Sequence, residues 1–211
     1  MLAGALVFVL LNSARVAAWA QGSGEILPPV DPVSWVKAGS IWRYSNDGTD
    51  QGQDWRFPDF SVADWPSGPA QLGYGDGDEA TVTREARPPH PMTSYFRTEF
   101  QVDRAGAFGQ LLVRLVRDDG AVVYLNGKEL LRDNMPVGEV LFDTPAAANA
   151  SDENAWRTFE ADAGLLVDGR NVLAVEVHQA STASTDMSFD FELTGRPAGS
   201  LTPVISISAV D

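Results

Sequence analysis

The sequence predicts an all-β protein, folded as an antiparallel β-sandwich, and three observations support this prediction. Short runs that alternate apolar and polar residues follow one another along most of the chain. Turn-forming residues bound each run, and a sustained 3.6-residue periodicity is almost absent. The 211 residues, 44% of them hydrophobic, suffice for one sizeable core. Short strands of this kind bury their apolar faces between two packed sheets.

The first 20 residues predict a secretory signal peptide. Their apolar run, residues 2–11, is too short to span a bilayer, and Ala18-Trp19-Ala20 matches the small-x-small pattern before a cleavage site. The usual positive segment is missing, and a buried helix is the alternative. Residues 21–33 are rich in Gly, Ser and Pro and predict a linker. We therefore expect a secreted or cell-surface protein whose folded domain covers residues 34–195.

Composition excludes several functions. The formal charge of −14 argues against binding to nucleic acid or to an anionic membrane, because both need a basic patch. The chain has no cysteine, which removes disulfides, thiolate metal sites and cysteine nucleophiles. Stability must therefore come from burial and backbone pairing.

Six strands are predicted, at residues 34–44, 93–102, 110–117, 121–125, 171–178 and 187–194. The clearest hairpin turns at Asn126-Gly127, since these two residue types accept the positive φ angles of a type I′ turn. Its second strand runs to Leu131. Two single helical turns are expected, around residues 61–64 and 161–166.

Alternation sorts side chains onto two faces of each strand. The expected inward set is Phe96, Thr98, Phe100, Leu111, Val113, Leu115, Leu173, Val175, Val177, Phe189, Phe191 and Leu193. The expected outward set is Tyr95, Arg97, Glu99, Arg114, Glu176, His178, Asp190 and Glu192. One interpretation of the outward set is a solvated face with ion pairs between strands. The other is a shallow ligand-binding face, with Tyr95 and His178 as platforms.

An acidic loop, LGYGDGDEAT at residues 72–81, separates two strand-like segments. Asp76, Asp78 and Glu79 offer the hard oxygen ligands that calcium prefers, and the glycines permit a tight backbone. The spacing differs from that of an EF-hand loop. A tight turn with solvated acids and a cation-binding loop therefore both remain open, and the acids at 118, 119, 186 and 190 are further candidates for such a site.

Two segments then suggest a family. RDDGAVVYLNGK at residues 117–128 and LLVDGRNVLAVEV at residues 165–177 resemble the galactose-binding-like jelly roll, including the sugar-binding domains of family 2 glycoside hydrolases. Together with LGYGDGDEAT, TSYFRTEF, NMP, VLAVEVHQ and SFDFEL, they resemble an accessory domain of large secreted bacterial proteins, found beside calcineurin-like phosphoesterase or lamin-tail modules. The resemblance covers roughly residues 35–195. Residues 196–211 resemble a linker entering a further β domain.

The resemblance implies a noncatalytic module that binds carbohydrate, with a structural calcium in many related jelly rolls. Aromatic rings and planar polar groups recognise sugars, and on this basis the candidate ligand-binding residues are Trp156, Tyr95, His178, Arg97, Glu176 and Tyr74. Packing of the core or of a loop is the alternative role for each aromatic residue. A structural spacer or protein-docking domain without a sugar site is the alternative for the whole chain.

Catalysis by this chain is not expected. The two histidines, His90 and His178, cannot supply the ligand pairs of a two-metal phosphoesterase site. No nucleophile elbow, phosphate loop or dinucleotide fingerprint occurs. A glycosidase needs only two carboxylates, and Glu176 with Glu192 is the pair that alternation favours.

Overall fold

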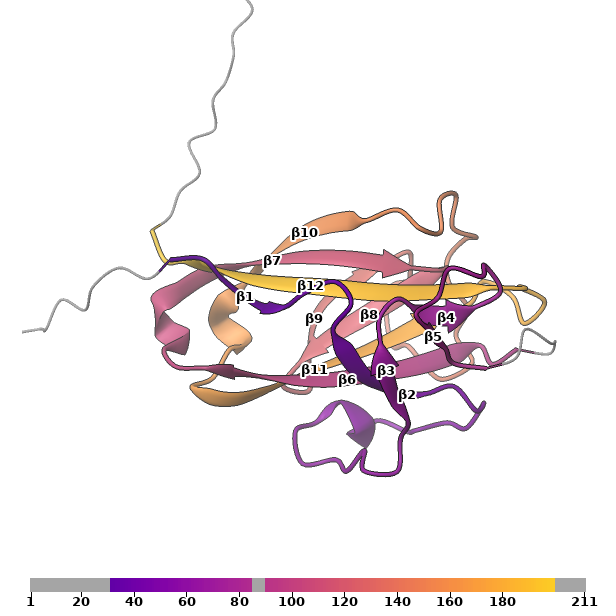
Figure 1. The fold of residues 1–211 in the computed structure, drawn as a ribbon, viewed down its shortest axis with the longest axis horizontal. Coiled ribbons are helices and arrows are strands. Elements are labelled where there is room, and N and C mark those ends of the chain that lie inside the picture. Colours follow the sequence, from indigo (N-terminus) through magenta and orange to yellow (C-terminus); the bar gives the residue numbers. More distant parts are fainter. Residues whose placement is uncertain (1–30, 85–89, 200–211) are drawn as a thin grey trace, which may run out of the picture.

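The structure, a computed structural model, describes residues 31–84 and 90–199. In these residues it forms two packed β-sheets, as predicted, together with three short 3-10 turns (Figure 1). The predicted signal peptide, most of the first linker and the tail from residue 200 lie outside the described residues.

The first sheet has the strand order β10-β7-β12-β4-β5, and β1 pairs with β12 beyond this path. Its strands are β1 (Val33–Val36), β4 (Leu72–Tyr74), β5 (Thr81–Val82), β7 (Phe108–Arg117), β10 (Arg157–Asp162) and β12 (Met187–Pro197). All pairs in it are antiparallel except β4 with β5. The last strand, β12, thus lies in the middle of this sheet and pairs with three others.

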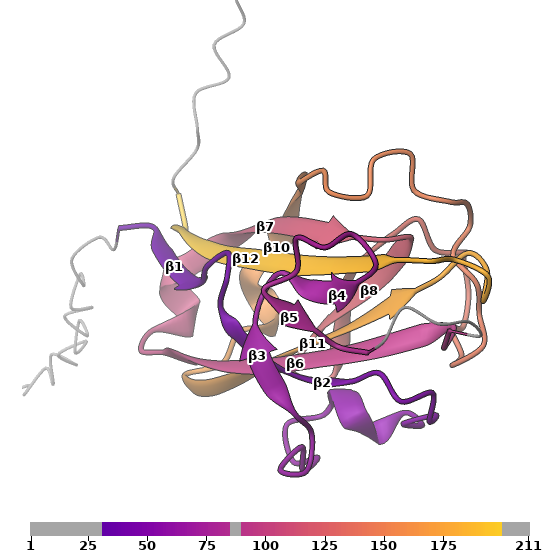
Figure 2. The same cartoon turned by 45° about the vertical axis from the view of Figure 1, so that its right-hand side comes forward.

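The second sheet has the order β3-β2-β6-β11-β8-β9 and is antiparallel throughout. Its strands are β2 (Ile41–Ser45), β3 (Ser67–Pro69), β6 (Thr93–Val102), β8 (Gly120–Leu125), β9 (Lys128–Asp133) and β11 (Gly169–His178). Figure 2 shows the two sheets as separate layers, with β7 and β12 in one and β6 and β11 in the other.

The predicted strands are confirmed, with one split. Strand β6 has the predicted bounds, and the ends of the other predicted strands agree to within three residues. The run at residues 34–44 forms two strands, β1 and β2, because the chain turns at Gly39 with a φ of 76°. The hairpin β8–β9 turns at Asn126 and Gly127, both with positive φ (53° and 83°), as the sequence predicts.

The main core lies between the sheets and contains the inward residues that alternation selects, apart from the half-buried Thr98. Phe189 of the first sheet meets the second sheet through Phe96, with ring centroids 4.2 Å apart, and through Trp42, at 5.0 Å. Such aromatic contacts add to the free energy gained by removing these large side chains from water.

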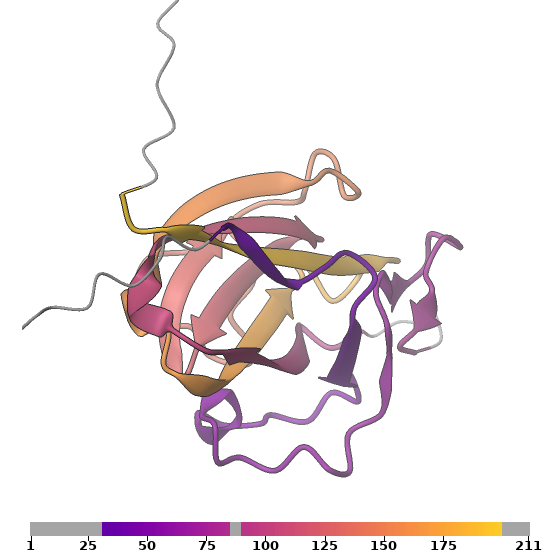
Figure 3. The same cartoon turned by 60° about the vertical axis from the view of Figure 1, so that its left-hand side comes forward.

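The expectation of a solvated outer face is wrong for most of the second sheet. Tyr95, Arg97, Glu176 and His178 are all buried, because two long connections cover this face. The first runs from β2 to β3 and contains the 3-10 turn η1 (Asp54–Arg56); Figure 3 shows it beneath the sheet. The second runs from β9 to β10. Side chains of the two connections and of the sheet form a second apolar cluster, which consists of Trp55, Tyr95, Val122, Tyr124, Met135, Val140, Ala146 and Ala174.

Ion pairs between strands do occur on the first sheet. Arg114 of β7 pairs with Glu192 of β12, its register partner. Asp190, also expected outside, is buried and accepts hydrogen bonds from the backbone N–H groups of Gly39 and Phe191. On the second sheet, Glu99 of β6 is exposed as expected and pairs with Arg170 of β11. The solvated-face interpretation therefore holds in part, for Arg114 and Glu192 on the first sheet and for Glu99 on the second.

The two predicted helical turns have different outcomes. The second is confirmed as the 3-10 turn η3 (Ala163–Leu165). The first is wrong: residues 61–64 form a simple turn that the Trp65 N–H closes by donating to the Val62 carbonyl.

Trp55 holds the covering connection onto the second sheet, and replacing Trp55 with Ala tests this role. Its ring lies 4.8 Å from that of Tyr95 and 5.9 Å from that of Tyr124. We expect Trp55→Ala to lower the free energy of unfolding by about 3–5 kcal/mol, because a large ring leaves a cavity. Urea denaturation measures the change. Phe57→Ala, on the same connection but 44% exposed, serves as the control with a much smaller loss. Equal losses for the two variants would contradict the packing described.

Candidate functional site

The structure separates the residues that the sequence proposes for ligand binding. Tyr95, Arg97, Glu176 and His178 lie under the covering connections, and Tyr74 is buried at the end of β4. Trp156 is half-buried, with the Arg114 guanidinium 4.6 Å from its ring centroid. A ligand would reach the four residues of the second sheet only after displacement of a packed connection.

The polar groups of this buried face bond to one another. Tyr124 donates a hydrogen bond to Glu176 (2.6 Å), and His178 Nε2 lies 3.5 Å from the other oxygen of Glu176. Burial, followed by the charge of Glu176, raises the pKa of Tyr124 above its ordinary value. This arrangement is structural, since it leaves no open side.

The carboxylate pair Glu176 and Glu192 does not form a site. Glu176 belongs to β11 in the second sheet, and Glu192 belongs to β12 in the first. Both point away from the core, and so they lie on opposite outer faces of the sandwich. The expectation that they share one face is wrong, because alternation assigns an inward or outward direction but does not assign a strand to a sheet.

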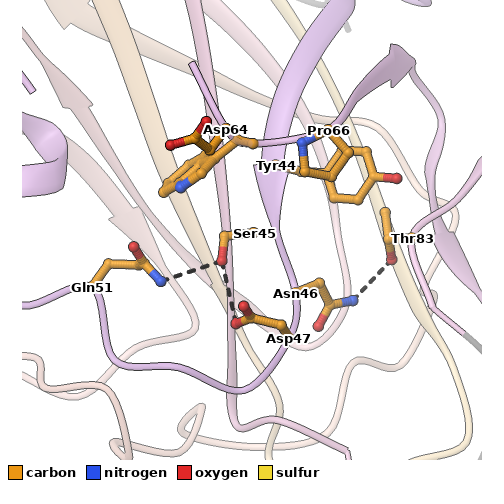
Figure 4. A pocket seen from close by; sticks show the side chains of 9 residues that line it. Tyr44, Ser45, Asn46, Asp47, Gln51, Asp64, Pro66 and Thr83 are labelled. Atoms are coloured by element: carbon orange, nitrogen blue, oxygen red, sulfur yellow. Dashed lines mark hydrogen bonds between the residues drawn. The ribbon is translucent and has the colours of Figure 1, made fainter. Parts of the chain in front are cut away.

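An open hollow of about 400 Å³ lies at the end of β2 (Figure 4). Its lining comes from β2 and the residues after it, from the close of the β2–β3 connection, and from the segment after β5. The lining residues are Tyr44, Ser45, Asn46, Asp47, Gln51, Asp64, Trp65, Pro66 and Thr83. Tyr44 and Trp65 are half-buried and supply aromatic surface, while amide and carboxylate groups supply the polar part.

Local hydrogen bonds fix the polar groups of this hollow. Asp47 accepts bonds from the hydroxyl (2.6 Å) and the backbone N–H (2.9 Å) of Thr49, and these bonds lower the pKa of Asp47. Gln51 donates to Ser45 (3.3 Å) and to Thr49 Oγ1 (2.7 Å), and Asn46 donates to Thr83 (2.8 Å). Asp47 is therefore an ionised acceptor held by its own turn.

Sequence reasoning missed most of this hollow. Tyr44 alternates with Trp42 in a predicted strand, and Trp65 lies in a segment whose aromatic residue could pack the loop onto the sandwich. Packing alone would explain either residue, so neither indicates a binding site. The polar cluster Asn46-Asp47-Gly48 appears in the sequence only as a turn signal. Proximity of Thr83 to Asn46 follows from the sheet topology, and no local pattern could have indicated it.

The acidic loop closes on itself. Asp76, Asp78 and Glu79 bring carboxylate oxygens within 4.8 Å of one another. The Glu79 carboxylate also accepts the backbone N–H groups of Asp76 (2.9 Å) and Gly77 (3.0 Å), which shapes a tight turn. These bonds agree with the turn interpretation, and the calcium interpretation of this trio remains a prediction.

A second group of acids joins Asp76 from distant parts of the chain. Carboxylate oxygens of Asp76, Glu153 and Asp186 also lie within 4.8 Å of one another. Asp118, buried nearby, has a pKa raised to about 8 by burial first and then by the charges of Asp119, Glu153 and Asp186. Burial also raises the pKa values of Asp76 and Glu153, as does the charge of Asp186.

Comparison with known proteins supports the fold. No protein-family model matches the chain, and no curated protein sequence matches it. Among solved structures, a β-glucuronidase of an uncultured Clostridium matches 82% of the chain with a TM-score of 0.50 at 20% identity. A Bacteroides uniformis β-glucuronidase matches 79% with a TM-score of 0.53 at 17% identity. A β-glucuronidase from Ruminococcus gnavus in complex with D-glucuronic acid matches 81% with a TM-score of 0.50 at 13% identity.

These matches show the fold alone. The chain has the fold of a β-sandwich that forms part of these much longer chains. It spans 31%, 18% and 31% of their lengths, respectively. Among the described residues, no helix is long and apolar enough to cross a membrane.

The raised pKa of Asp118 predicts a pH dependence of stability in buffer free of divalent ions. Between an ordinary value of 3.8 and about 8, the folded state binds one proton more than the unfolded state. The free energy of unfolding therefore falls as the pH rises across this window, by at most about 1.4 kcal/mol per pH unit. Asp118→Asn removes this contribution.

The measurement is urea denaturation of both proteins at several pH values from 4.5 to 8, evaluated as the difference between them. That difference isolates Asp118 from the other acids. A difference that does not vary with pH would show that Asp118 titrates normally in the folded protein.

Proposed function

We propose that this chain is a noncatalytic carbohydrate-binding module of a larger secreted protein, and that the hollow at the end of β2 is its ligand site. The observation that carries the proposal is the composition of the hollow, in which two accessible aromatic rings stand among hydrogen-bonding groups that are already oriented. A sugar ring has an apolar face that stacks on aromatic surface, and hydroxyls that require planar donors and acceptors.

The orientation of the polar groups supports this role. Asn46, Asp47 and Gln51 are each held by a neighbouring side chain, so a ligand would meet partly preorganised donors and acceptors. Fixed groups of this kind favour hydroxyl-rich ligands over purely apolar ones.

A noncatalytic role agrees with the chemistry of the hollow. A glycosidase needs a carboxylic acid with a raised pKa as its proton donor. Asp47 has a lowered pKa instead, because Thr49 stabilises its carboxylate. The hollow is also open rather than a deep cleft.

The fold gives further support to the proposal. The similar solved structures are named as β-glucuronidases, which act on sugars, and the chain corresponds to a minor part of each. The sequence segments also resemble sugar-binding domains of family 2 glycoside hydrolases. A module joined to further domains is the simplest interpretation of both.

The test is a glycan-array and polysaccharide binding screen with the purified chain, followed by titration of any ligand found. We expect Trp65→Ala and Tyr44→Ala each to weaken binding by about tenfold or more, since stacking on one ring contributes about 1–2 kcal/mol. Incubation with the ligand should release no reducing sugar.

Two controls locate the site. Phe57→Ala changes an exposed ring of the same connection outside the hollow and should bind normally. Trp156→Ala tests the aromatic residue that the sequence suggests. If only this variant loses glycan binding, the ligand site lies beside Trp156 at the first sheet and not in the hollow. Absence of binding to any glycan would instead favour a structural spacer or protein-docking domain.

A further inference from the structure

We propose that a calcium ion binds at one end of the sandwich, between the acids Asp76, Asp118, Glu153 and Asp186 and the amide oxygen of Gln179; we name these five residues the acidic end. They come from separate parts of the chain: the β4–β5 connection, the turn between β7 and β8, the connection before β10, and the residues between β11 and β12. Figure 1 shows the β4–β5 connection and the turn before β12 toward the same end of the molecule.

The first argument is the convergence of carboxylates. Asp76, Glu153 and Asp186 place one oxygen each within 4.8 Å of the others. Such a spacing suits a shared cation, since calcium binds oxygen ligands at about 2.3–2.6 Å. Without a cation, three carboxylates in so small a space repel one another.

The second argument is independent of the first: two buried oxygens at the acidic end have no partner. Within the described residues, Asp118 Oδ2 and Gln179 Oε1 accept no hydrogen bond, although their residues are only 1% and 2% exposed. A buried acceptor without a partner costs about 1–3 kcal/mol, and more when it is charged. The described residues contain other buried polar atoms without a partner, but these two acceptor oxygens belong to residues that contact or feel the charge of the acids.

Both residues with an unpartnered oxygen lie close to the acids. Gln179 donates its amide N–H to the backbone carbonyl of Asp186 (2.7 Å) and to the Tyr74 hydroxyl (3.3 Å), which holds its amide beside Asp186. Asp118 lies close enough to Glu153 and Asp186 for their charges to disfavour its ionisation. A cation bound among these residues would therefore give both oxygens a partner.

Within residues 31–84 and 90–199, no Lys or Arg side chain forms an ion pair with these acids, although the charge of Asp186 acts on His90. Among the ion pairs of the described residues, none includes Asp76, Asp118, Glu153 or Asp186. Arg117, the nearest arginine in sequence to Asp118, pairs with Asp133 and donates to the Asp119 carbonyl (2.6 Å) instead. In the described part of the chain, no salt bridge therefore compensates the negative charge of the acidic end.

The ligand chemistry selects calcium among common cations. All five donors are oxygens, and the chain has no cysteine to attract softer metals. Four carboxylates and one amide, with water, can supply the six to eight ligands of calcium. Magnesium requires a near-ideal octahedron, which side chains from four separate connections are poorly suited to provide.

The proposed site shares only Asp76 with the trio suggested by the sequence. Glu79 uses its carboxylate to close its own turn, and Asp78 is exposed. This difference supplies a matched control, because Asp78→Asn removes an equal charge from the same connection without touching the proposed ligands. The proposal does not depend on sugar binding, because the hollow and the acidic end share no residue.

The experiment is calorimetric titration of the chelator-treated chain with calcium, and in parallel with magnesium, together with thermal unfolding in each ion. We expect binding of calcium, and a midpoint of unfolding that rises with calcium up to about 5 mM, because an ion that binds the folded state stabilises it. Asp186→Asn and Glu153→Gln should each weaken calcium binding by at least about tenfold, whereas Asp78→Asn should bind like the parent chain.

Absence of both heat and stabilisation with calcium would overturn the proposal. Loss of binding in Asp78→Asn, with retention in Asp186→Asn and Glu153→Gln, would also overturn it and place the ion in the acidic loop. Circular dichroism shows whether each variant is folded. If Asp186→Asn fails to fold, Glu153→Gln decides the outcome.

Discussion

A buried guanidinium determines how the outer face of the second sheet is used. Arg97, 2% exposed, donates hydrogen bonds to the carbonyls of Trp55 and Phe57 (the latter at 3.0 Å), which lie on the β2–β3 connection. Burial lowers its pKa, yet a guanidinium remains charged, so it must keep these acceptors. These hydrogen bonds hold the β2–β3 connection against the second sheet. Trp55 then covers the outer face of this sheet by packing on Tyr95 and Tyr124.

The position of the connection decides where a ligand can bind. Because the broad face of the second sheet is occupied by the protein's own side chains, accessible sites are left at edges and ends. The return of the connection carries Asp64 and Trp65 into the wall of the hollow, where Arg43 donates to the Trp65 carbonyl (2.7 Å). The connection that covers the outer face of the second sheet therefore also forms part of the wall of the hollow.

Strands and their core were predictable from the sequence, while the sites were not, for a physical reason. A period of two is imposed locally by backbone geometry, and it reveals Phe96, Val175 and Phe189 as core residues. Alternation carries no information on what covers the opposite face, so Tyr95 and Glu176 were expected to be solvated. Likewise, the meeting of Asp76 with Asp186 depends on the pairing of β4 with β12, a contact between segments more than one hundred residues apart.

The hollow and the acidic end are linked by the short strand β4. Gly73 of β4 packs so closely on β12 that a Cβ there would overlap the Met187 carbonyl, so this contact requires glycine. On the other side, the Gly73 carbonyl accepts the backbone N–H of Thr83 (2.8 Å), and Thr83 accepts the Asn46 amide in the wall of the hollow. Beyond the end of β4, Asp76 reaches the acidic end and accepts a hydrogen bond from Ser188 of β12 (3.0 Å). Three residues of backbone thus connect the two regions, and any ligand that fixes Asp76 also restricts the segment that positions Thr83.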